Sequence, residues 1–148
     1  MNTKFILLIT GAVLSLLFLV FAAQVFEVLY YEREFSNEMF NQGHYTTVGL
    51  LVAGVAWGLS AVYYYAVNSV SFSRWYHWLI VLAVAAVAVT IATYVWLDGQ
   101  FADDGLDFSG QLLNFAVITM LVEAVAFTVA SFSMRWWSSN CRHTPFPE

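Results

Sequence analysis

Charged residues are scarce in this sequence. Five lysines and arginines and ten aspartates and glutamates make up 10% of the 148 residues, whereas hydrophobic residues make up 61%. A soluble domain is about one quarter charged, so this composition excludes an ordinary soluble fold and indicates a protein that lies in a lipid bilayer. The few basic residues are also scattered, and we therefore predict no nucleic-acid partner.

Cysteine and histidine are scarce as well. The single cysteine, Cys141, excludes an internal disulfide and a dithiol exchange site. The three histidines, at positions 44, 77 and 143, fall in separate predicted regions, so no two can hold a haem between helices. The cluster Asp98, Asp103, Asp104 and Asp107 lacks the alternation of ligands in a calcium loop, and no spacing fits zinc. We predict no metal and no cofactor.

Proline occurs only at positions 145 and 147, so it interrupts none of the long apolar stretches that precede it. Four of these stretches reach the roughly 20 residues that a helix needs to cross a bilayer. The sequence predicts an all-α membrane protein, a four-transmembrane-helix up-down-up-down bundle. Its domain covers residues 1–137, with spans at about 5–31, 45–68, 76–97 and 110–135, and an extended tail follows at 138–148. We expect the first span to remain as a helix and not to be cleaved as a secretory signal.

Basic residues predict the orientation of these spans. Lys4, Arg74, Arg135 and Arg142 fall on one side, whereas the opposite segments, 32–45 and 98–110, are acidic and hold only Arg33. Because basic loops stay in the cytoplasm, both termini are predicted to be cytoplasmic, in a bacterial inner membrane. Aromatic residues, including Tyr63, Tyr64 and Tyr65, are predicted to line the same boundaries.

Small residues recur at a four-residue spacing in three of the spans, including Ala88 and Ala92 in the third. Gly54 and Gly58 form a GxxxG pair that Ala61 extends, and the last span carries Ala126 and Ala130. Such pairs let helices approach closely in a membrane. We expect them to pack the spans within one chain, with a contact to another chain as the alternative.

One acidic residue, Glu123, interrupts the last span in the stretch ITMLVEAVAFTV. It is eleven residues from both Leu112 and Met134, which is about 16 Å of helix in each direction and places it at the bilayer midplane. A charge there costs roughly 2.5 to 3.5 kcal/mol. We therefore expect Glu123 to be protonated and hydrogen-bonded to side chains at a similar depth in the other spans, namely Ser15, Trp57 and Thr90.

Two interpretations of Glu123 remain open. The favoured one is a clasp between helices, in which a neutral acid bonds to hydroxyl or indole groups. The other is a proton or cation site, with Gln24 and Glu27 lining an approach from the outer side. Carriers usually show broken helices or duplicated halves, and the sequence shows neither, so the clasp is favoured.

The tail suggests a docking peptide, because its prolines favour an extended conformation that loses little entropy on binding. The residues predicted to dock are Arg142, His143, Pro145, Phe146 and Pro147. The leading hypothesis is a non-enzymatic subunit that scaffolds a larger multi-protein membrane complex, with other subunits or a second copy as partners. The alternative is a proton-coupled small transporter or channel that uses Glu123. A third hypothesis, a lipid- or quinone-directed membrane enzyme, requires a cleft that opens sideways to the bilayer.

Overall fold

The computed structural model describes residues 3–67, 71, 74–103, 105 and 108–138, and every regular element in these residues is a helix. Four segments are long and apolar enough to cross a membrane, as the sequence predicts. They are Thr3–Val20, His44–Val67, Trp75–Asp103 and Ser109–Trp137. The predicted docking residues of the tail, Arg142, His143, Pro145, Phe146 and Pro147, lie outside the described residues.

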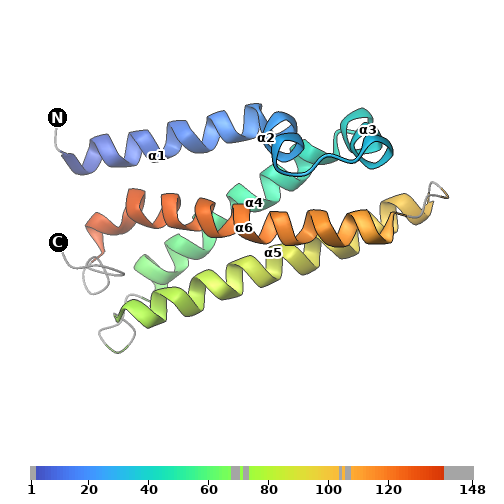
Figure 1. Ribbon diagram of the computed structural model, residues 1–148. Helices are drawn as coiled ribbons and strands as arrows, with labels where there is room; N and C mark the ends of the chain where they lie inside the picture. The colour runs from blue at the N-terminus through green and yellow to red at the C-terminus, as the bar shows by residue number, and fades with distance from the viewer. Residues whose placement is uncertain (1–2, 68–70, 72–73, 104, 106–107, 139–148) are drawn as a thin grey trace.

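Short helices flank the long ones. In chain order the elements are α1 (Thr3–Val20), α2 (Ala22–Leu29), α3 (Arg33–Asn41), α4 (His44–Ala61), the π-helical turn η1 (Val62–Val67), α5 (Trp75–Asp103), α6 (Ser109–Met134) and the 3-10 turn η3 (Arg135–Trp137). Figure 1 shows the start of α1 and the ends of α4 and α6 at one end of the molecule, with α3 at the other.

Helix α6 is the centre of the bundle, because it packs against α5, α4 and α1. It lies alongside α4, where Ser60 and Ser131 share a hydrogen bond of 3.2 Å and Tyr65 donates its hydroxyl to the Met134 carbonyl. By contrast, α1 and α5 form no comparable contact, and Figure 1 shows α6 between them. The second and fourth long helices, α4 and α6, therefore pack directly against each other. They do not occupy opposite corners of a square four-helix arrangement.

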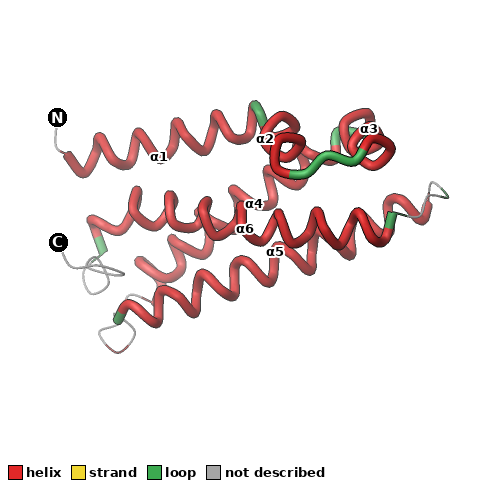
Figure 2. The backbone as a smooth tube through the Cα atoms, viewed as in Figure 1, coloured by secondary structure: helices red, strands yellow, loops and turns green. Residues whose placement is uncertain are grey.

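The predicted first span, 5–31, corresponds to two helices. Helix α1 ends at Val20, Phe21 has φ −105° and ψ 24°, and α2 begins at Ala22 and turns away from the axis of α1 (Figure 2). No proline or glycine adjoins this bend. After the bend α2 packs closely against α4: it buries Ala22 and Phe26, and a Cβ placed on Gly49 of α4 would lie 3.0 Å from the Ala22 Cβ.

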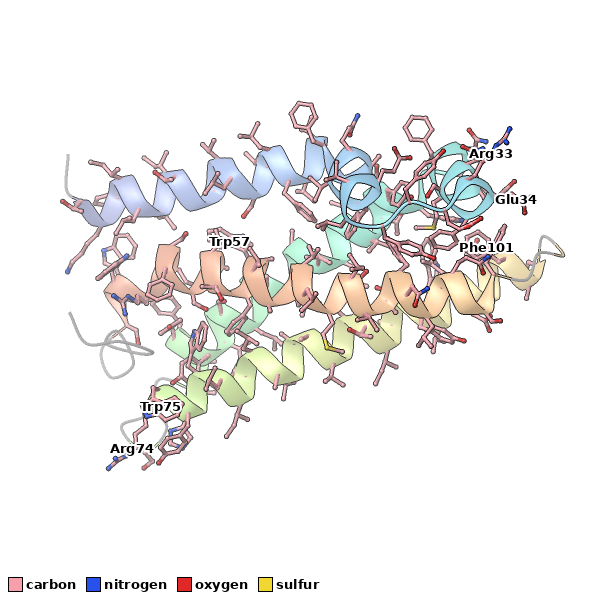
Figure 3. The ribbon with its side chains drawn as sticks, viewed as in Figure 1. Arg33, Glu34, Trp57, Arg74, Trp75 and Phe101 are labelled. Carbon is pink, nitrogen blue, oxygen red and sulfur yellow. The ribbon has the colours of Figure 1, made fainter. Side chains whose placement is uncertain are left out.

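Segment 32–45, predicted as a polar outer loop, contains helix α3. This helix buries Phe35, Ser36 and Met39, whereas Arg33 and Glu34 are exposed at the end of the molecule (Figure 3). The Ser36 hydroxyl accepts a hydrogen bond of 3.1 Å from the Glu32 backbone N–H, which ties the first turn. Helix α3 thus covers one end of the bundle.

Two hydrophobic clusters fill the interior, one towards each end. The cluster near α3 is built on aromatic rings, with Phe35 in contact with Phe101, Phe108 and Phe115 at centroid distances of 5.6 to 5.8 Å. The cluster at the other end contains Tyr63, Tyr64, Trp78 and Phe127, among others. Tyr63 and Tyr64 are 2% and 0% exposed, because the π-helical turn at the end of this span directs them into the core, so their rings are not presented to lipid.

Candidate functional site

Glu123 lies on the face of α6 that is turned into the bundle. Its side chain is 0% exposed, and one helical turn away on either side Thr119 and Phe127 are buried as completely. This spacing follows from the 3.6-residue period of the helix. Phe115 belongs to the cluster near α3 and Phe127 to the opposite cluster, so the carboxyl group lies between the two.

Neither carboxyl oxygen of Glu123 has a hydrogen-bond partner among the described residues. The donors predicted to bond it are engaged elsewhere: Trp57 donates its indole N–H to the Ser15 hydroxyl at 2.8 Å, and Thr90 donates to the Ala86 carbonyl at 2.7 Å. The predicted clasp between these side chains and Glu123 is therefore wrong. Ser15 and Trp57 do meet at one depth, but they join α1 to α4, and Thr90 bonds back to its own helix, as helical hydroxyls often do.

The buried side chains near the middle of the neighbouring helices are mostly apolar; the exception is Thr93 of α5, which is 0% exposed and whose hydroxyl also has no hydrogen-bond partner among the described residues. In the middle of α4 the buried side chains are Val52 and Ala56, and in the middle of α5 they are Ala85, Ala86 and Val89. An unpaired carboxylate in such surroundings is very costly, and even the neutral acid loses its hydrogen bonds to water. Glu123 is thus a buried polar group that packing alone does not explain.

The predicted approach through Gln24 and Glu27 is not formed by the described residues. Both belong to α2, where Gln24 is exposed and Glu27 is partly buried. Between α2 and α6, the rings of Phe26, Tyr45 and Phe115 pack at centroid distances of 5.1 to 6.0 Å. These rings fill the interior on the α3 side of Glu123. The structure therefore does not bring Gln24 and Glu27 together with Glu123.

The GxxxG pair faces outwards. Gly54 and Gly58 are exposed, and a Cβ placed on either would meet no atom within 4 Å. The expectation that this pair packs the bundle is wrong, and the alternative, a contact with another chain, is left open. Ala61 is partly buried, and Ala126 and Ala130 do pack inside, the latter with 0% exposure.

Two other glycines make the close helix contacts, and the sequence analysis missed both. A Cβ on Gly11 of α1 would lie 1.7 Å from the hydroxyl oxygen of Ser133 in α6, and Gly49 of α4 approaches Ala22 of α2. The signal was present, because Gly11 precedes Ser15, and Gly49 precedes Ala53, by the same four residues as the GxxxG pair. A small-residue pair shows that close approach is allowed, not in which direction it occurs.

The remaining polar chemistry of the described residues is sparse. They contain no group of three or more histidine, cysteine, aspartate or glutamate side chains placed to hold a metal ion. No protein-family model matches this chain, and neither does any curated protein or solved structure. Function is therefore inferred from two features of its own geometry, the outward GxxxG pair and the unbonded Glu123.

Proposed function

We propose that this protein is a non-enzymatic integral membrane subunit that joins a larger assembly through the outer face of α4. That face consists of Leu50, Gly54, Gly58 and Val62, all of them exposed. The observation that carries the proposal is the free space around Gly54 and Gly58. Without side chains, the helix backbone at these positions can be approached closely by a helix of another chain.

The rest of the bundle supports this use of glycine. In α1 and α4, Gly11 and Gly49 are each in close contact with a neighbouring helix. At Gly54 and Gly58, by contrast, no atom of the described residues lies within 4 Å of an added Cβ. Since lipid tails are as apolar as leucine, exposed apolar side chains alone drive no association in a membrane, whereas close backbone packing does.

The proposed orientation is an up-down crossing of a bacterial inner membrane with both termini in the cytoplasm. Figure 3 shows Arg74 at one end of the molecule and Arg33 with Glu34 at the other. Arg135 follows the end of α6, at the same end as the start of α1 (Figure 1). By the positive-inside rule, the end that holds Arg74 and Arg135 faces the cytoplasm, which supports the proposed orientation. In this proposal the tail docks on a cytoplasmic partner.

The α4 contact is tested by replacing both glycines with isoleucine. Gly54→Ile with Gly58→Ile should release the partner chains, because side chains there hold a second helix away, while the isolated chain stays folded since no atom lies within 4 Å. The measurement is the mass of the complex extracted in mild detergent, with co-purifying chains identified. The matched control is Ala88→Ile with Ala92→Ile, also exposed and four residues apart on α5. A wild-type protein that is purely monomeric, or a glycine variant that keeps all its partners, contradicts the proposal.

A second candidate function is a proton-coupled transporter or channel that uses Glu123. The observation that favours it is the absence of hydrogen bonds to both carboxyl oxygens, since a clasp would be bonded. A lone acid inside a membrane bundle is the kind of group through which carriers couple transport to protons.

Glu123→Gln separates the two functions. In the transporter, the amide cannot take up or release a proton, so proton flux into proteoliposomes that contain the purified protein should be lost. In the assembly subunit, the complex should keep its mass, since the amide has nearly the volume of the acid. Proton flux that persists in the glutamine variant excludes a role for Glu123 in coupling.

A further inference from the structure

A cavity of about 470 Å³ lies between α1, α2, α4 and α6. Its volume falls in the range of roughly 300 to 1,000 Å³ that is usual for small-molecule sites. Among the described residues that line it, only Ser15 and Trp57 have polar side-chain atoms, and the others are leucine, valine, alanine and phenylalanine side chains. The occupant must therefore be mainly apolar.

The two polar side chains of the lining are bonded to each other. Trp57 donates its N–H to the Ser15 hydroxyl at 2.8 Å, and Figure 3 shows Trp57 between α1 and α6. The indole has no other donor and no acceptor. The lining also offers no acid, base or metal ligand, so it is suited to holding a molecule and not to transforming it.

The cavity crosses the middle of the bundle. Ser15 and Trp57 lie at one end, and Val25 and Leu29 of α2 lie towards α3. Along α6 the lining runs from Leu121, near Glu123, to Val129 on the side away from α3, which is about 12 Å of helix. This length is comparable with the roughly 15 Å thickness of half a hydrocarbon core.

The rim of the cavity faces the surroundings of the bundle. Four lining residues are about half exposed or more: Leu14 at 51%, Leu29 at 49%, Leu121 at 60% and Val125 at 66%. Leu14, Leu121 and Val125 belong to segments that lie in hydrocarbon if the long helices cross a membrane, and Leu29 is the last residue of α2, which follows the first of these segments. Entry is then sideways, from the lipid.

From these features we propose that the cavity holds one acyl chain of a membrane phospholipid, which enters from the α3 side and extends past the level of Glu123. The methyl end of the chain lies against Trp57 and Ser15, and the glycerol end lies near Leu29. The apolar lining, the length of about 12 Å along α6 and the exposed apolar rim all match an acyl chain. A quinone ring would leave its carbonyl oxygens largely without donors here, and a partner helix is much wider than a single chain.

The site is tested with two photoreactive phospholipids in vesicles of otherwise unlabelled phosphatidylethanolamine and phosphatidylglycerol. One carries a diazirine at the chain end and the other carries it near the glycerol. The first should label the peptides of Ser15 and Trp57, and the second should label the peptide of Val25 and Leu29. Labelling by both probes that is spread evenly over α5 as well overturns the proposal.

Occupancy is tested by filling the cavity. Ala53→Phe places a ring in it and should reduce the phospholipid retained per chain in mild detergent by about tenfold, the loss expected when about two methylene groups can no longer be buried. Ala88→Phe, on the exposed face of α5, is the matched control and should retain the wild-type amount. Val25→Trp narrows the opposite end of the cavity and should act like Ala53→Phe, so the test survives if one variant fails to fold.

The same mass measurement distinguishes the other occupants. Unchanged phospholipid in both filling variants overturns the proposal, and so does a quinone or a second protein chain that only these variants lose. The α4 contact lies on a different face, so the glycine variants should keep the phospholipid. Failure of either proposal is thus visible without failure of the other.

Discussion

At the scale of single residues, Glu123 is the least satisfied side chain that the structure describes. Its two carboxyl oxygens are buried and unbonded, while the nearest hydroxyl on its own helix, that of Thr119, donates to the Phe115 carbonyl at 2.9 Å. An unsatisfied polar group of this kind costs about 1 to 3 kcal/mol of folding stability. The bundle would therefore be more stable without it, which points to a role other than packing.

This cost gives a prediction. Glu123→Leu should raise the free energy of unfolding by about 1 to 3 kcal/mol, because an apolar side chain of similar size needs no hydrogen bonds. Thermal unfolding in a mild detergent measures the effect, with Val125→Leu at the exposed neighbour as the control. A leucine variant less stable than the wild type would show that the carboxyl has a partner after all.

The position of Glu123 near the middle of its helix could be predicted from the sequence, but its surroundings could not. Counting from the ends of a span gives depth, because the rise per residue is constant. Ser15, Trp57 and Thr90 were selected by depth alone. Two of them do meet, at 2.8 Å, but they meet each other, because the direction in which each side chain points depends on how the helices are rotated. The same limit explains why Gly54 and Gly58 were assigned to the interior.

At the scale of elements, α3 and the bend at Phe21 differ most from expectation. Helix α3 is short and mostly polar, so hydropathy misses it, yet Phe35 and Met39 are four residues apart and share its buried face. That spacing is a helical signal that could have been recognised. The bend has no signal in its own residues, and the close contacts of α2 with α4 that follow it join residues far apart in the sequence.

A pair of phenylalanines in α3 tests how this helix is held. Phe35→Ala should destabilise the protein by about 3 to 5 kcal/mol, because the ring is fully buried among other rings. Phe40→Ala, in the same helix but 59% exposed, should change stability little. Unfolding of both variants in the same detergent provides the comparison, and similar losses would mean that α3 does not dock as described.

At the scale of the whole molecule, four candidate spans were predictable because bilayer thickness sets helix length. The packing of α4 directly against α6 was not, since connection lengths give the order of helices and not their diagonal contacts. The side-by-side pairs Ser60 with Ser131 and Tyr65 with Met134 involve single hydroxyl groups that no periodicity identifies.

The proposed orientation predicts which surfaces are reached from each side. After Cys141→Ser, a cysteine at Asn37 in α3 should react with an impermeant maleimide in intact cells, whereas a cysteine at Arg74 should react only after the membrane is opened. Both positions are exposed, so reactivity reports sidedness and not burial. The reverse pattern would invert the topology, and equal labelling of both sites would refute a spanning α4.

The uneven burial of the long helices affects how the chain can be made. Helix α1 buries only Gly11, and its largest contact is with α6, the last long helix to be synthesised. Of the four long helices, α1 is made before its main packing partner, so until α6 arrives its contacts are limited to α2 and to α4, which it meets through the Ser15–Trp57 hydrogen bond. Any factor that shelters a solitary helix during that interval would act on α1.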